Sequence, residues 1–112
     1  MVIQYIQIIF VVIHCNMNDI QKDIEKQLII YSNLMVNKFK WLTIKFEYCV
    51  NRRCFLLVYY TNNIEDDLFY MALSEYSNLM NLFYNNVAPI FCINESLFKL
   101  SNNAHTIKYN VK

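Results

Sequence analysis

Two cysteines are spaced so that they could do redox chemistry. Cys49 and Cys54 flank a short polar segment, and a two-residue turn at Asn51 and Arg52 would place them opposite each other across a hairpin. Directly opposed residues of a non-hydrogen-bonded antiparallel pair have Cα atoms about 4.5 Å apart, at the short end of the disulfide range. The spacing therefore predicts a candidate redox pair. The alternative is two reduced thiols in a cytoplasmic protein.

The other side chains that bind metals do not form a recognisable ligand set. They are His14, Cys15, Cys92 and His105. No two of them show the spacing of a zinc site, so we predict no metal and no other cofactor. Three consecutive acidic residues, Glu65 to Asp67, are better explained by a helix start, where the helix dipole favours carboxylates. No nucleophile, base and orienting group occur in a pattern that indicates catalysis, and we do not expect an enzyme.

The chain contains no glycine, which excludes several functional classes. Phosphate-binding P-loops, Rossmann dinucleotide sites, kinase glycine-rich loops and nucleophile elbows all need glycine for their backbone conformations. An AT-rich genome explains the shortage of glycine, alanine, arginine and proline, because their codons are GC-rich. The missing glycine is therefore informative about excluded sites rather than about a selected function.

The composition predicts one folded domain with little net charge. Hydrophobic residues make up 56% of the 112 residues and charged residues 17%, against about 45–50% and 25% in average proteins. This excludes intrinsic disorder, and the length suits a single domain spanning residues 1–112. Ten basic residues nearly balance nine acidic ones. We expect a protein partner rather than nucleic acid, since phosphate neutralisation needs a surplus of positive charge.

Residues 2–13 form an apolar run whose role has two interpretations. The run is rich in valine and isoleucine, which favour strands, and both alternating faces are apolar, as in a central strand. Alternatively, residues 1–16 are a leader or an upstream extension, and the domain comprises residues 17–112. The run is too short to span a membrane and lacks the basic start of an export signal, so we expect a cytoplasmic protein.

The remaining patterns predict two helices and three further strands. A helix begins at Asn18 or Asp19 and runs to about Lys38, and a hairpin follows over residues 41–50 and 54–60. A second helix begins near 65–67 and ends near 85–86. A short strand over 90–93, a helical turn over 95–100 and a strand over 106–111 complete the chain. The order β-α-β-β-α-β predicts a ferredoxin-like α+β fold, an antiparallel sheet with two helices on one face.

The face of the hairpin that should point away from the helices is unusually apolar. On the alternating pattern it carries Trp41, Leu56, Val58 and Tyr60. A second copy, another protein or a misplaced segment of the same chain must cover this face, because large exposed apolar patches usually mark contacts. We therefore expect a non-enzymatic protein-interaction module, self-associating as a homodimer through these four residues.

A nucleic-acid-binding domain is the alternative function. The hairpin over residues 41–60 is rich in aromatic rings, which stack on bases in some RNA-binding sheets, and Arg52 and Arg53 lie at its tip. However, the aromatic residues at 46, 48, 55 and 59 fall on the face assigned to the helices. The expected partner therefore remains a protein.

Overall fold

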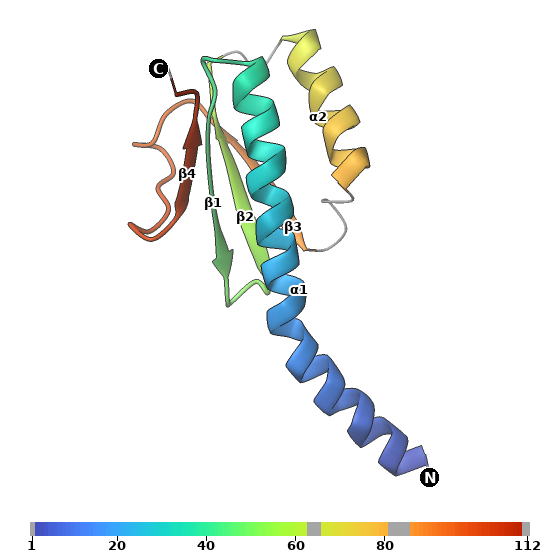
Figure 1. Cartoon of the computed structure of the whole chain (residues 1–112). Helices are drawn as coiled ribbons and strands as arrows, with labels where there is room; N and C mark the ends of the chain where they lie inside the picture. Colours follow the sequence, from blue (N-terminus) through green and yellow to red (C-terminus); the bar gives the residue numbers. More distant parts are fainter. Residues whose placement is uncertain (1, 63–65, 81–85, 111–112) are drawn as a thin grey trace.

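The protein is an α+β domain built on a four-stranded mixed sheet. The computed structural model describes residues 2–62, 66–80 and 86–110, and of residues 2–18 it describes the backbone. The sheet has the order β3-β2-β1-β4, and both helices lie on one of its faces (Figure 1). The elements in chain order are α1 (Val2–Lys38), β1 (Thr43–Cys49), β2 (Cys54–Tyr60), α2 (Asp67–Met80), β3 (Val87–Cys92) and β4 (His105–Lys108).

The sheet differs from the antiparallel sheet that the sequence predicted. β1 pairs antiparallel with both β2 and β4, but β2 and β3 are parallel. Parallel strands need a crossover between their ends, and α2 provides it. The ferredoxin-like order is therefore corrected to α-β-β-α-β-β, while the α+β class and the placement of both helices on one face are confirmed.

Residues 2–13 are helical, which corrects the prediction of a central strand. They belong to α1, a continuous helix of 37 residues, so no helix start occurs at Asn18 or Asp19. Strand propensities differ by only about 1 kcal/mol between the best and the worst residues, and they depend on the surroundings, so valine and isoleucine favour a strand only weakly. Extending an existing helix adds one hydrogen bond per residue without a new nucleation cost. Continuation of α1 therefore outweighs the local preference for a strand.

The core lies between the helices and the inner face of the sheet. Its most buried side chains are Leu28, Tyr31, Met35 and Phe69 from the helices, and Ile44, Phe46, Leu57 and Tyr59 from the strands. The hydroxyl groups of Tyr31 and Tyr59 form a hydrogen bond of 2.6 Å between α1 and β2. Burial raises the pKa of both phenols above its ordinary value, so they stay protonated and neutral inside the core.

The start of α2 and the hairpin turn follow local rules. The carboxylate of Asp66 accepts hydrogen bonds from the backbone N–H groups of Leu68 and Phe69, at 2.9 and 3.4 Å, and so caps α2. Between β1 and β2, Arg53 adopts a positive φ of 54°. This left-handed conformation usually selects glycine, which the chain lacks, and an arginine therefore occupies a strained turn position.

The open edge of β3 is protected against pairing with another strand. Phe55 and Thr61 donate backbone hydrogen bonds to the carbonyl groups of Asn86 and Cys92. Backbone groups in a strand point alternately to its two sides, so those of residues 87, 89 and 91 point away from β2, toward the open edge. Residue 89 is Pro89, which has no N–H to offer there. Proline at such a position discourages edge-to-edge association.

Candidate interaction surfaces

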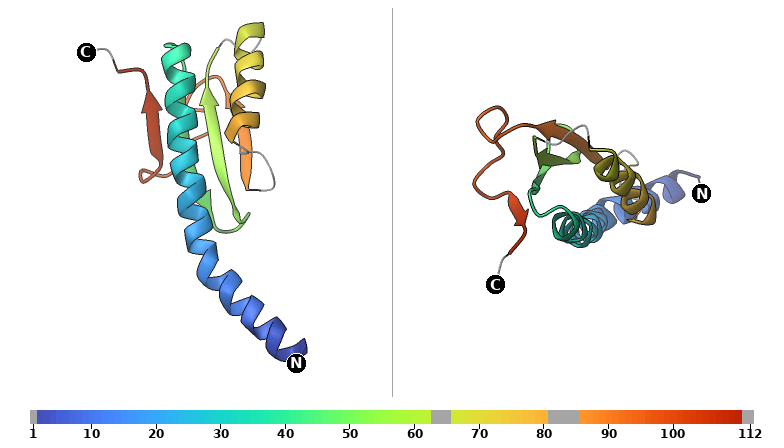
Figure 2. Two further views of the ribbon diagram at one scale, coloured as in Figure 1. Left: turned by 45° about the vertical axis from the view of Figure 1, so that its right-hand side comes forward. Right: turned by 90° about the horizontal axis from the view of Figure 1, so that it is seen from above.

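The outer face of the sheet is covered by a segment of the same chain. The covering loop, residues 93–104, connects β3 to β4 and crosses the face opposite the helices (Figures 1 and 2). Val58 is completely buried and Tyr60 is 6% exposed, packed with Cys92 and Leu100. Leu56 is partly buried against the same cluster. Of the three covers that the sequence allowed, the structure shows a segment of the chain itself.

Polar contacts fix the covering loop to the two central strands. The Tyr60 hydroxyl donates a hydrogen bond of 2.6 Å to the carbonyl of Phe98. The Glu47 carboxylate accepts hydrogen bonds from the backbone N–H of Ser101, at 3.0 Å, and from its hydroxyl. Lys45 forms an ion pair with Glu95, with 3.0 Å between Nζ and Oε1. Burial, and then the charge of Glu95, raises the pKa of Tyr60.

Trp41 lies on the helical side of the molecule, which corrects its assignment to the outer face. It precedes β1, in the turn after α1, so the strand alternation does not extend to it. Its ring packs 5.4 Å from that of Phe39 and 5.5 Å from that of Phe69, measured between ring centres. Trp41 and the other three predicted contact residues therefore do not form one surface.

The hairpin tip brings the two cysteines together as neighbours in the sheet. The register pairs Cys49 directly with Cys54, and both thiols are free and half-buried. Val50 to Arg53 connect the strands, with a hydrogen bond of 3.3 Å from the Arg53 N–H to the Val50 carbonyl. Arg52 and Arg53 are exposed beside the cysteines.

The aromatic rings of the hairpin are not arranged as a base-stacking platform. Phe46, Phe55 and Tyr59 lie in the core under the helices, and Tyr60 lies under the covering loop. Among the described hairpin residues, Arg52 and Arg53 are the candidates for nucleic-acid contact that remain exposed. They supply two positive charges without an adjacent exposed ring.

Helix α1 carries an apolar stripe that continues beyond the sheet. The stripe consists of Ile3, Ile6, Phe10, Ile13, Met17, Ile20 and Ile24, spaced alternately three and four residues apart. In one continuous helix this spacing places the seven positions on one side. It runs on, four residues later, into Leu28, Tyr31 and Met35, which are fully buried against the sheet. The side of α1 that packs on the sheet therefore continues toward the N-terminus as the apolar stripe.

The sheet does not cover the whole stripe. Ile24 is partly buried against the core, whereas Ile20 is 51% exposed. Figures 1 and 2 show the N-terminal part of α1 leaving the sheet, with no other described element alongside it. An apolar stripe of seven residues thus extends from the core to a region where no described part of the chain covers it.

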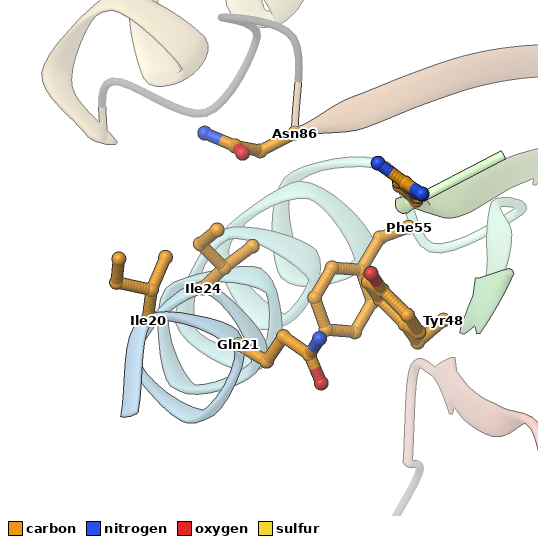
Figure 3. Close-up of a pocket in the computed structure, with 7 residues that line it drawn as sticks. Ile20, Gln21, Ile24, Tyr48, Phe55 and Asn86 are labelled. Atoms are coloured by element: carbon orange, nitrogen blue, oxygen red, sulfur yellow. The ribbon is translucent and has the colours of Figure 1, made fainter. Parts of the chain in front are cut away.

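A small cavity marks the place where α1 leaves the sheet. It has a volume of about 150 Å³ and lies between α1 and the hairpin end (Figure 3). Ile20 and Ile24 line it on one side, and Tyr48, Arg53 and Phe55 on the other. This is below the roughly 300–1,000 Å³ of a ligand pocket, but an apolar cavity of this volume accommodates a benzene-sized group. The cavity is therefore large enough to hold one large apolar side chain.

Helix α2 offers a second, less continuous apolar surface. Leu68, Met71 and Leu79 are exposed along it. Glu75 is also exposed. It lies four residues from both Met71 and Leu79, and therefore on the same side of the helix. A charge in the middle of this surface makes it a weaker contact candidate than the stripe on α1.

Two kinds of site are absent from the described residues. Within the described part of the chain, no helix combines the length and hydropathy needed to cross a bilayer. The described side chains contain no group of three metal-binding residues. Comparisons of the chain with protein-family models, curated proteins and solved structures gave no match.

The stripe on α1 was missed because residues 2–13 were interpreted with the period of a strand. A three-and-four spacing is present from Ile3 to Ile24, and it would have indicated one long helix. By contrast, the covering loop has no pattern of its own. Its position depends on Lys45 and Glu47, which are distant from it in the sequence.

Proposed function

We propose that this protein is a small, non-enzymatic interaction module that associates with a second copy of itself through the apolar stripe of α1. The observation that carries the proposal is the continuity of the stripe with the core-facing side of the helix. In the second half of α1, this side is buried by the sheet. In the first half, the α1 stripe of a second copy would bury it.

The spacing of the stripe favours a helix as the occupant. Alternating steps of three and four residues are the pattern of a coiled-coil contact, in which each helix contributes the same seam. From Ile3 to Ile24 the stripe spans 22 residues, or about 33 Å of helix. An isologous contact between identical stripes satisfies both copies at once. The cavity beside Ile20 offers space for a partner side chain at the end of this contact.

A membrane surface is a less suitable occupant. Helices that lie on membranes combine an apolar side with a polar side rich in lysine and arginine. The chain has no lysine or arginine before Lys22, and Asp19 and Asp23 are acidic. The polar residues of the N-terminal part are Gln4, Gln7, His14, Asn16 and Asn18, and none of them carries the permanent positive charge of lysine or arginine.

The proposal is tested by replacing one isoleucine of the stripe in the full chain. Ile13→Gln removes an apolar contact from both copies without lowering helix propensity, since glutamine forms helices at least as well as isoleucine. A loss of roughly 1.5 kcal/mol per copy corresponds to about a hundredfold weaker association. Sedimentation equilibrium over a range of concentrations measures this change.

Ile8→Gln is the matched control, because position 8 falls on the side of α1 opposite the stripe. We expect it to change the association constant less than threefold. A wild-type chain that is monomeric at all concentrations contradicts the proposal. Equal effects of the two substitutions would contradict a one-sided helix contact, and sedimentation with anionic vesicles would then identify a membrane as the occupant.

A further inference from the structure

We propose that Cys49 and Cys54 form a reversible cross-strand disulfide by exchange with a low-molecular-weight disulfide such as oxidised glutathione. The proposal is independent of the association of α1. The two cysteines lie beside the turn between β1 and β2, at the end of β2 that is far from α2.

The register is the main observation. Cys49 and Cys54 are the last pair of the β1–β2 ladder and stand directly opposite each other. Directly opposed residues have Cα atoms about 4.5 or 5.5 Å apart, according to whether the pair is hydrogen-bonded. Both separations fall within the usual disulfide range of about 4.4–6.8 Å. The strands therefore need no rearrangement of register to bring the two sulfur atoms together.

The two thiols share one face of the sheet. Tyr48 and Phe55 belong to the helix-facing core, so alternation along each strand directs their neighbours Cys49 and Cys54 to the other face. Both cysteines are half-buried and neither is in a disulfide, so a small reagent can reach them. Cys92 differs because it is buried under the covering loop, where its thiol contacts the Asn94 carbonyl at 3.1 Å.

The surroundings of the pair suit an anionic disulfide. Arg52 and Arg53 are exposed in the turn that joins the two cysteines. Glutathione carries a net negative charge, and a cluster of positive charge raises the local concentration of such a reagent. The arginines also lie between the cysteines in sequence, so neither cysteine is more than three residues from a positive charge.

The exchange balances without any further reactant. The thiolate of one cysteine attacks a sulfur of oxidised glutathione, forming a mixed disulfide and releasing one glutathione thiolate. The thiolate of the second cysteine then attacks the protein-side sulfur and releases the second glutathione. The two protein thiols lose two electrons and two protons, and one oxidised glutathione becomes two molecules of reduced glutathione. Excess reduced glutathione reverses both steps.

The test uses the full wild-type chain equilibrated in glutathione buffers of increasing oxidised fraction, quenched with acid and alkylated. Trypsin cleaves after Arg52 and Arg53, so a Cys49–Cys54 disulfide leaves two peptides joined through sulfur. Chymotrypsin separates Cys54 from Cys92 by cutting at the aromatic residues between them. Mass spectrometry of the unreduced digest then identifies each link.

We expect the Cys49–Cys54 link to exceed mixed disulfides at either cysteine more than tenfold, because the second thiol acts at high effective concentration. Cys92→Ser should leave the half-oxidation ratio of glutathione unchanged within twofold. Cys49→Ser should abolish the link and leave Cys54 as a mixed disulfide. Four free thiols, persistent mixed disulfides in the wild type, a link to Cys15 or Cys92, or a link between two copies would each overturn the proposal.

Discussion

The two faces of the sheet are covered by different means. On the inner face, α1 and α2 bury Ile44, Phe46, Leu57 and Tyr59 almost completely, and the hydroxyl groups of Tyr31 and Tyr59 form a hydrogen bond between α1 and β2. On the outer face, the covering loop buries Val58 and Tyr60 over a smaller area and is anchored by polar contacts. The inner face thus depends mainly on apolar packing, and the outer face on apolar packing combined with several hydrogen bonds and an ion pair.

This difference indicates how the two covers should respond to perturbation. Helices held by a large apolar contact are removed only when the whole domain unfolds. A loop held by a few polar anchors can open while the remaining sheet stays intact, because its local free energy of opening is lower than that of global unfolding. The following variants test this contrast.

Two adjacent leucines on β2 compare the faces directly. Leu57 is completely buried on the inner face, and Leu56 is partly buried on the outer face. We expect Leu57→Ala to lower the free energy of unfolding by about 2–5 kcal/mol and Leu56→Ala by roughly half as much or less. Urea denaturation measures both. Equal losses would show that the covering loop packs as tightly as the helices.

The buried tyrosine pair makes the inner face sensitive to alkali. Because the pKa of each phenol is raised on folding, the folded chain keeps protons that the unfolded chain releases above about pH 10. Stability is therefore complete below that pH and falls as the pH rises. Tyr31→Phe should cost about 1–3 kcal/mol at neutral pH, since the Tyr59 hydroxyl loses this partner, and should make the alkaline decline less steep.

The matched control for this effect is Tyr70→Phe, at an exposed position on α2. It should leave the stability near pH 7 unchanged and the slope above pH 10 the same as in the wild type. Denaturation series from pH 7 to 11 provide both quantities. An unchanged slope in Tyr31→Phe would contradict the assignment of the alkaline loss to the core pair.

On the outer face, Tyr60→Phe removes the hydrogen bond to the Phe98 carbonyl while keeping the ring in place. We expect a loss of about 0.5–1.5 kcal/mol, confined to the covering loop. Amide hydrogen exchange should become faster over residues 93–104 and remain unchanged in β1 and β2. Equal acceleration in the central strands would mean that the loop and the sheet open as one unit.

Arg53 belongs to neither face and provides a reference with the smallest expected effect. Asparagine tolerates a positive φ better than arginine, so Arg53→Asn should raise the free energy of unfolding by about 0.5–1 kcal/mol. The costs of Leu56→Ala and Leu57→Ala should be the same in this background, because distant sites are additive. If the variant is less stable than the wild type, contacts of the arginine side chain stabilise the fold by more than the strain of its backbone costs.

The local elements of the sheet and α2 were predictable from short-range patterns. The alternation around Ile44 and Phe46 correctly placed one side of the hairpin under the helices, and the acidic residues near Asp66 marked the start of α2. Residues 2–13 were wrongly assigned because valine and isoleucine favour strands only weakly, whereas a long helix gains a hydrogen bond with each added residue. Trp41 was misplaced because the strand begins two residues after it.

Residue types and short spacings were sufficient to predict the α+β class, the hairpin with its paired cysteines, and an excess of apolar residues that some surface must bury. These features depend on residue type and on separations of a few positions. Long-range packing determines which segments bury that excess: residues 93–104 cover Val58 and Tyr60, and α2 connects β2 to a parallel β3. Such pairings join residues 30 or more positions apart. These pairings are set by the free energy of the complete fold, which cannot be read from the residue pattern of any short segment.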